Sequence, residues 1–338
     1  MTTATTLQQP QAPLAMAARF SFVSDLSSAA RVLCNLSGFG RKSWLDRLLS
    51  PRAVAQRIEL TSADGETMTV EVSGAGRPLL LVHGLGGSHH DWDAVVAPLS
   101  RCHRVYTLDL CGHGARATAD ARPTLESMAR DLALVIDRLS LDRPLLAGHS
   151  MGALVVMQYL RDHGADQLSG VCFVDQSPRI TTDAQWQLGL FGTLTRDQLQ
   201  SGLARLRGDF VETVLAEAAA RLDPLRTPGA EHGLLGRSLR RLLARFQAAV
   251  GVAPMLSMLE SLAECDFRDV IARLAVPTLV VLGGASHHYS GLPLAEYYRD
   301  ALPNGTVTTY DASAHSPHRQ EPAHFAADLT AFAARHCA

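Results

Sequence analysis

The segment that most constrains the fold of this chain is G-H-S-M-G at residues 148–152, between an apolar run at Pro144–Ala147 and a helical pattern at Leu154–Leu160. A G-x-S-x-G sequence in this context is typical of a sharp strand-to-helix turn that exposes its serine. Both flanking glycines have a steric reason, because side chains there would collide with the neighbouring backbone. The pattern predicts an α/β fold with Ser150 as a candidate nucleophile beside a helix N-terminus.

The rest of the chain alternates between short apolar runs and helical patterns. The predicted strands are Arg57–Leu60, Thr67–Val72, Leu79–Val82, Val105–Leu108, Pro144–Ala147, Val171–Val174, Pro277–Leu282 and Val307–Tyr310. The predicted helices are Thr124–Leu139, Leu154–Leu160, Leu294–Leu302 and Pro322–Ala334. Alternation with mostly apolar strands predicts a mostly parallel central sheet covered by helices on both faces.

This alternation also suggests the domain organisation. Residues 56–178 and 266–338 carry it and form the predicted core. Residues 179–265 interrupt it with Leu, Ala and Arg at helical spacing, which predicts a helical insertion that caps the core. Residues 1–55 are predicted to be a tail and a helical extension. That extension either packs on the protein's own body or meets a membrane surface or a partner.

Composition excludes several classes of function. With 47% hydrophobic residues the chain of 338 residues is predicted to be globular. The 31 basic and 33 acidic side chains nearly cancel, which argues against a nucleic-acid partner. No apolar run is long enough for a membrane span, so no integral membrane association is expected. The six scattered cysteines fit free thiols in a reducing compartment, and we expect a cytoplasmic protein.

A glycine-rich loop, H-G-L-G-G at residues 83–87, follows the predicted strand Leu79–Val82. Such a loop can direct backbone N–H groups toward a substrate oxygen near Ser150. We predict that the N–H groups of Leu85 and Met151 form an oxyanion hole. The loop matches neither of the common phosphate-binding patterns.

A serine nucleophile needs a base, and the segment A-H-S-P-H at residues 314–318 follows the last predicted strand. His315 would then lie on the last strand-to-helix loop, after the serine in the chain order expected for this kind of sheet. The sequence therefore predicts His315 as the general base. His318 is predicted to have a solvated or structural role.

The chain from about residue 56 to residue 336 resembles the α/β-hydrolase superfamily. The matching segments are 83–87, the D-L-C-G-H-G segment at 109–114, the G-x-S-x-G segment at 148–152, and 315–322. The resemblance implies an α/β-hydrolase fold with a serine, histidine and acid triad. It also implies that Asp109 belongs to a structural turn beside the pocket.

The triad acid is where the chain departs from the family pattern. Relatives usually carry an aspartate after the strand Pro277–Leu282, but Ser286 occupies that place here. A serine cannot stabilise an imidazolium as a carboxylate does. Some members of the superfamily place the acid after the preceding strand, where this chain has Asp175. We therefore predict Asp175 as the acid and assign Asp311 to a loop cap, with loss of the triad as the rival hypothesis.

These residues predict a serine hydrolase that cleaves an apolar carboxylic ester, lactone or thioester through an acyl-enzyme intermediate. A serine rather than an aspartate nucleophile argues against epoxide hydrolase and haloalkane dehalogenase activity. Acyl transfer, cyclisation and C–C bond hydrolysis use the same triad and stay open. A non-catalytic small-molecule receptor is the alternative from another class.

The predicted substrate pocket combines core and insertion residues: His83, Gly84, His149, Trp186, Phe191 and Ser286. The histidine pairs 89–90 and 287–288 lack a third ligand at metal-site spacing and are expected at the surface or at the pocket rim. We expect no metal and no cofactor. A small-molecule acyl substrate is the expected partner, and a homodimer is left open.

Overall fold

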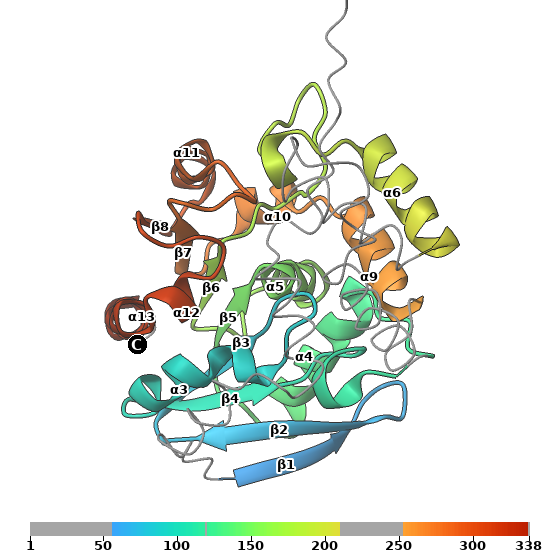
Figure 1. Cartoon of the computed structure of the whole chain (residues 1–338). Coiled ribbons are helices and arrows are strands. Elements are labelled where there is room, and N and C mark those ends of the chain that lie inside the picture. Colours follow the sequence, from blue (N-terminus) through green and yellow to red (C-terminus); the bar gives the residue numbers. More distant parts are fainter. Residues whose placement is uncertain (1–55, 119, 210–252, 337–338) are drawn as a thin grey trace, which may run out of the picture.

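One eight-stranded sheet organises the computed structural model, which describes residues 56–118, 120–209 and 253–336. The strands are β1 (Gln56–Thr61), β2 (Thr67–Ser73), β3 (Arg77–Val82), β4 (His103–Leu108), β5 (Leu145–His149), β6 (Gly170–Val174), β7 (Thr278–Gly283) and β8 (Gly305–Tyr310). Their order in the sheet is β1-β2-β4-β3-β5-β6-β7-β8. β2 is antiparallel to both of its neighbours, and the strands from β4 to β8 are parallel (Figure 1).

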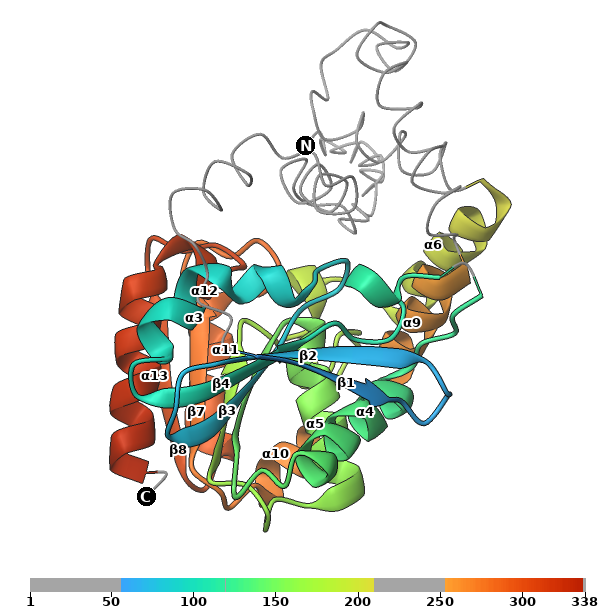
Figure 2. The same ribbon diagram turned by 90° about the horizontal axis from the view of Figure 1, so that it is seen from below.

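Helices cover both faces of this sheet (Figure 2). The α-helices are α3 (Asp93–Leu99), α4 (Leu125–Arg138), α5 (Met151–His163), α6 (Arg196–Gly208), α9 (Ala253–Glu264), α10 (Arg268–Arg273), α11 (Gly291–Ala301), α12 (Pro317–Gln320) and α13 (Pro322–His336). The mostly parallel sheet predicted from the sequence is confirmed. All eight predicted strands are present, with ends that differ by one or two residues at most.

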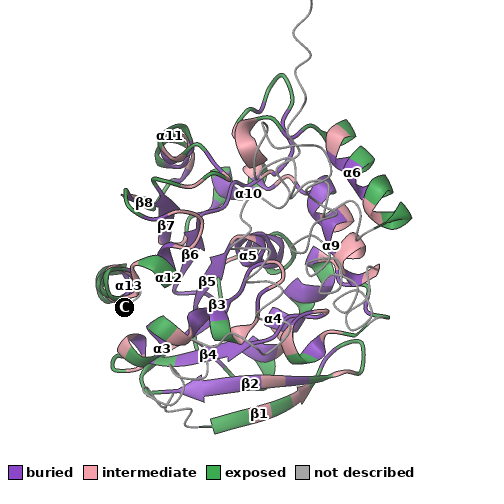
Figure 3. Cartoon of the chain, in the orientation of Figure 1, coloured by how far each residue is buried: buried purple, intermediate pink, exposed green. Residues whose placement is uncertain are grey.

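The sheet separates two apolar cores, because successive side chains of a strand point to opposite faces. In β3, Leu80 and Val82 belong to the core under α4, α5 and α11, and Leu79 and Leu81 belong to the core under α3 and α13. Figure 3 shows the inner strands buried and the edge strand β1 largely exposed. This arrangement explains why the inner strands are apolar along their whole length.

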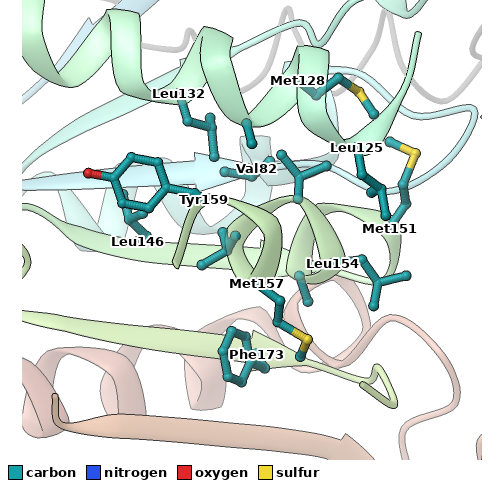
Figure 4. Packing of buried hydrophobic residues seen from close by; sticks show 14 of the residues in the cluster. Val82, Leu125, Met128, Leu132, Leu146, Met151, Leu154, Met157, Tyr159 and Phe173 are labelled. Carbon is teal, nitrogen blue, oxygen red and sulfur yellow. The ribbon is translucent and has the colours of Figure 1, made fainter. Parts of the chain in front are cut away.

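Helix α5 fills the centre of the first core (Figure 4). Its Leu154 and Met157 are buried, together with Phe173 of β6 and Leu132 of α4. The helix begins at Met151, immediately after Ser150, and so starts three residues earlier than its apolar periodicity predicts. The packing of α5 therefore fixes the position of the residue at its N-terminus.

The structure describes part of the predicted helical insertion. Helices α6 and α9 lie within residues 179–265, but the described residues 179–195 contain only a short 3-10 helix at Leu190–Gly192. Asp183 accepts hydrogen bonds from the N–H groups of Gln185 and Trp186, and this turn competes with a helix. Residues 210–252 and the predicted N-terminal extension lie outside the described residues.

Three short helices, α3, α10 and α12, were not predicted. Each has fewer than eight residues, so its apolar positions span too few turns to show a helical period. Pro98 in the last turn of α3 weakens the pattern further. Helix α3 covers the second core beside α13, and it is stabilised by this packing.

Several histidines are buried in the described part of the chain. Burial lowers the pKa of His113 to about 4 and that of His149 to about 3, and it holds the pKa of His318 well below the ordinary value. His318 packs between Trp92 and His149, with ring centroids 4.2 and 4.5 Å away. Neither of its ring nitrogens has a hydrogen-bond partner among the described residues. Its predicted structural role is consistent with this place in the core.

These buried imidazoles predict acid-sensitive folding. An unfolded histidine takes up a proton near pH 6.5, whereas the buried rings stay neutral to a lower pH. Stability is therefore full above about pH 6.5, and it falls as the pH drops toward the folded-state values. Each ring contributes about 1.4 kcal/mol per pH unit in that window. Urea unfolding followed by circular dichroism should give a clearly lower midpoint at pH 5 than at pH 7.5. Equal midpoints would contradict the assignment of neutral buried rings.

The orphaned nitrogens of His318 predict that His318→Phe stabilises the protein. Phenylalanine keeps a planar ring between Trp92 and His149 and removes polar atoms that are buried without partners. The free energy of unfolding should rise by about 1–2 kcal/mol, measured by urea titration. The control His318→Ala should instead lower it by about 2 kcal/mol or more, because it leaves a cavity. A less stable Phe variant would show that the imidazole has a partner in solution.

Candidate active site

Ser150 lies at the sharp turn between β5 and α5. Its φ of 52° is in the left-handed region that non-glycine residues rarely occupy. A Cβ atom on Gly148 would come within 2.4 Å of the Gly152 carbonyl oxygen, and one on Gly152 within 2.3 Å of the Val82 carbonyl oxygen. Both glycines are therefore required by close backbone approach, as the sequence predicts.

His315 joins Ser150 to Asp175. Its Nε2 atom lies 2.9 Å from Ser150 Oγ, and its Nδ1 atom lies 2.6 Å from Asp175 Oδ2. An ionised carboxylate only accepts hydrogen bonds, so Nδ1 carries the hydrogen and Nε2 is free to accept from the hydroxyl. The three side chains, from three different loops, form one hydrogen-bonded chain.

Asp175 follows β6 and is buried, with a φ of 46°. Its Oδ1 accepts from the Gly283 amide at 2.9 Å, and its Oδ2 accepts from Ser286 Oγ at 2.7 Å. Burial raises the pKa of Asp175, and these two hydrogen bonds oppose the rise because they stabilise the charged form. Ser286, at the position of the missing family aspartate, thus donates to the carboxylate that faces His315.

Two glycines at the end of β7 allow the loops of the site to meet. A Cβ atom on Gly283 would lie 2.0 Å from the Ala314 carbonyl oxygen, and one on Gly284 would lie 2.7 Å from the Asp311 Cα atom. The loop that carries His315 therefore passes directly over the end of β7. Close approach of these backbones brings His315 within reach of Asp175.

Burial lowers the pKa of His315 to about 4. The adjacent Asp175 carboxylate acts in the opposite direction, because it favours the protonated ring. With a pKa of about 4 the imidazole is neutral at pH 7, and its Nε2 atom can accept a hydrogen bond from the Ser150 hydroxyl. The geometry and the charge state suit proton transfer from serine to histidine.

The glycine-rich loop after β3 lies against Ser150. A Cβ atom on Gly84 would be 3.3 Å from Ser150 Cβ, so only glycine fits here without a shift. Leu85 follows in the same loop and is half-buried, and Met151 is the first residue of α5. The two predicted oxyanion donors thus belong to segments that flank Ser150.

The two predicted pocket histidines are both buried and hydrogen-bonded to backbone. His83 is fully buried, with Nδ1 donating to the Gly84 carbonyl and Nε2 accepting from the Leu110 amide. His149 is also buried, and its Nε2 donates to the His315 carbonyl oxygen at 2.7 Å. Both rings hold the backbone of the loops around Ser150.

The two predicted insertion residues differ in their relation to the site. Trp186 is buried, donates from Nε1 to the Arg179 carbonyl and packs edge-on against Tyr297. The ring of Phe191 lies 5.6 Å from that of His288, which in turn stacks on His315. Only Phe191 is connected to the site by ring contacts.

Sequence reasoning missed His288 as a neighbour of His315. It assigned the pair 287–288 to the surface or pocket rim, and His287 is indeed exposed. The sequence did carry one signal: His288 lies two residues after Ser286, which occupies the usual place of the acid. A pattern of residue types alone does not reveal a ring stack between distant loops.

Asp109 takes the structural role that the resemblance implies. Its carboxylate accepts from the amides of His89 and Ala115 and contacts the His89 ring at 2.7 Å. The described ranges contain no group of three or more histidine, cysteine or acidic side chains that could hold a metal ion. They also contain no helix long and apolar enough to cross a membrane.

Comparisons with known proteins agree with this architecture. A family model described as alpha/beta hydrolase fold matches residues 77–322. The chain is 30% identical to a pimeloyl-[acyl-carrier protein] methyl ester esterase from Vibrio cholerae, over 78% of this chain and 97% of that protein. It is 26% identical to a non-heme haloperoxidase from Rhodococcus erythropolis, over 66% of this chain and 80% of that protein.

Solved structures show the same fold at lower identity. An esterase from Exiguobacterium antarcticum superposes with a TM-score of 0.63 and 21% identity, covering 82% of this chain and 99% of that one. An enol-lactonase from Burkholderia xenovorans gives a TM-score of 0.60 and 18% identity, covering 81% and 99%. With the family model spanning most of the sheet and the linked serine, histidine and aspartate at its strand ends, the chain belongs to the α/β-hydrolase family.

Proposed function

We propose that this protein is a serine hydrolase that cleaves a carboxylic ester through an acyl-enzyme intermediate. The observation that carries the proposal is the hydrogen-bonded chain from Asp175 through His315 to Ser150. The names of the relatives, which include esterases, support ester hydrolysis as the reaction. A thioester or a lactone would react by the same steps.

In the proposed mechanism, Ser150 Oγ attacks the substrate carbonyl carbon while His315 Nε2 takes the hydroxyl proton. The amides of Leu85 and Met151 stabilise the oxyanion of the tetrahedral intermediate. His315 then gives its proton to the leaving alcohol, and the acyl-enzyme forms. Water attacks the acyl-enzyme with His315 as base, and the free acid and Ser150 are released. Asp175 orients the ring and stabilises its positive charge throughout.

We propose further that residues 179–265 cap the site and select an apolar acyl group. The contact between Phe191 and His288 supports this, because the His288 ring stacks on His315. Helix α9 is joined to the core by Ser261 Oγ, which accepts from the Leu125 amide, and by Ser257 Oγ, which donates to the Pro123 carbonyl. A small-molecule substrate and a cytoplasmic location are part of this proposal.

Loss of the nucleophile provides the first test. Incubation with a fluorophosphonate should add one adduct to the wild type, seen by intact mass, and none to Ser150→Ala. The same variant should lose roughly five to six orders of magnitude in kcat on a p-nitrophenyl acyl ester, because no other group forms the acyl-enzyme.

Two other outcomes would favour the alternatives. A wild type that forms no adduct and turns over no substrate would argue for the receptor alternative. An added alcohol or amine that diverts the product from the free acid would indicate acyl transfer.

Removal of the acid tests the unusual position of Asp175. Asp175→Asn should lower kcat by about four orders of magnitude, because the amide favours the wrong imidazole tautomer and leaves the imidazolium without its counter-charge. Asp311→Asn is the matched control, since Asp311 is exposed and lies four residues before His315. It should react at the wild-type rate. A large loss in the control and none in Asp175→Asn would move the role of the acid to Asp311.

A further inference from the structure

His288 lies face to face with the imidazole of His315. The two ring centroids are 3.8 Å apart, and the ring planes are inclined by only 18°. The backbone N–H of His288 donates to Ser286 Oγ, whose hydroxyl donates to Asp175. One short loop after β7 therefore contacts both the carboxylate and the imidazole of the proposed triad.

The insertion fixes the position of His288. The N–H of Phe191 donates to the His288 carbonyl oxygen at 2.7 Å, and the two rings lie 5.6 Å apart. Phe191 has a φ of 60°, a conformation that costs a non-glycine residue free energy and persists only where its surroundings hold it. Phe191 holds this unfavourable conformation where it contacts His288. We therefore infer that the insertion constrains the position of His288.

We propose that His288 is a positioning residue that holds the His315 ring in line with Ser150 and Asp175. This role rests on the proposed function. His315 must keep one nitrogen on each partner during proton transfer, and a stacked ring opposes rotation of the imidazole out of that line.

The charged neighbours of His288 are compatible with this role. Asp175, at the end of β6, interacts electrostatically with His288, and His315, on the loop after β8, is the ring that it covers. Phe191, from the insertion, adds no charge. The stack therefore contributes through ring contact with His315.

The test compares two apolar replacements. His288→Leu fills a similar volume without an aromatic face, and His288→Phe keeps the face but cannot be protonated. We expect the rate of Ser150 labelling by a fluorophosphonate, and kcat on a p-nitrophenyl acyl ester, to fall roughly tenfold in the Leu variant with KM within about twofold. The Phe variant should recover to within about threefold of the wild type. His287→Ala, at the exposed neighbouring position, is the matched control and should be unchanged.

A spectroscopic measurement separates positioning from folding. The proton between His315 Nδ1 and Asp175 should give a low-field NMR resonance in the wild type and in His288→Phe, and it should broaden in His288→Leu. A Leu variant with wild-type labelling, or a Phe variant as slow as the Leu variant, would overturn the role of His288. A wild type that never reacts would overturn the proposed function instead, so the two failures are distinguishable.

Discussion

A buried carboxylate in a protein needs hydrogen-bond donors. The arrangement of the loops around Ser150 depends on the donors that reach Asp175. Its two oxygens are met by the Gly283 amide, the Ser286 hydroxyl and the His315 ring. These donors come from the end of β7, from the loop after β7 and from the loop after β8. A single buried charge thus ties three neighbouring strand ends together.

The backbone around Asp175 has positive φ angles and close contacts that residues with a side chain rarely tolerate. Ser150 and Asp175 both have positive φ, and Gly148, Gly152, Gly283 and Gly284 leave no room for a Cβ atom. The Ser150 amide donates to the Val174 carbonyl, directly before Asp175, so the two strained positions support each other. Local strain of this kind is stabilised by the two apolar cores on either side of the sheet.

Much of this architecture could be predicted from the sequence, because the inner strands are apolar on both faces and are separated by turns and helices. The place of Asp175 could also be predicted, since Ser286 leaves its usual position without a carboxylate. The turn at Asp183 is made by local hydrogen bonds, but the helical spacing of the surrounding segment concealed it. The short helices α3, α10 and α12 could not be predicted, because their stability depends on contacts with distant segments. The framework role of His83 and the stack of His288 on His315 were hidden for the same reason.

The position of the carboxylate after β6 has a consequence for which substitutions the site can tolerate. The family resemblance implies an aspartate in the loop after β7, where a substitution would remove the acid itself. In this chain the loop from 284 to 290 contains no acidic side chain, and the carboxylate that faces His315 follows the neighbouring strand. A substitution in this loop can therefore alter the hydrogen bond from Ser286 or the ring contact of His288 without removing the carboxylate.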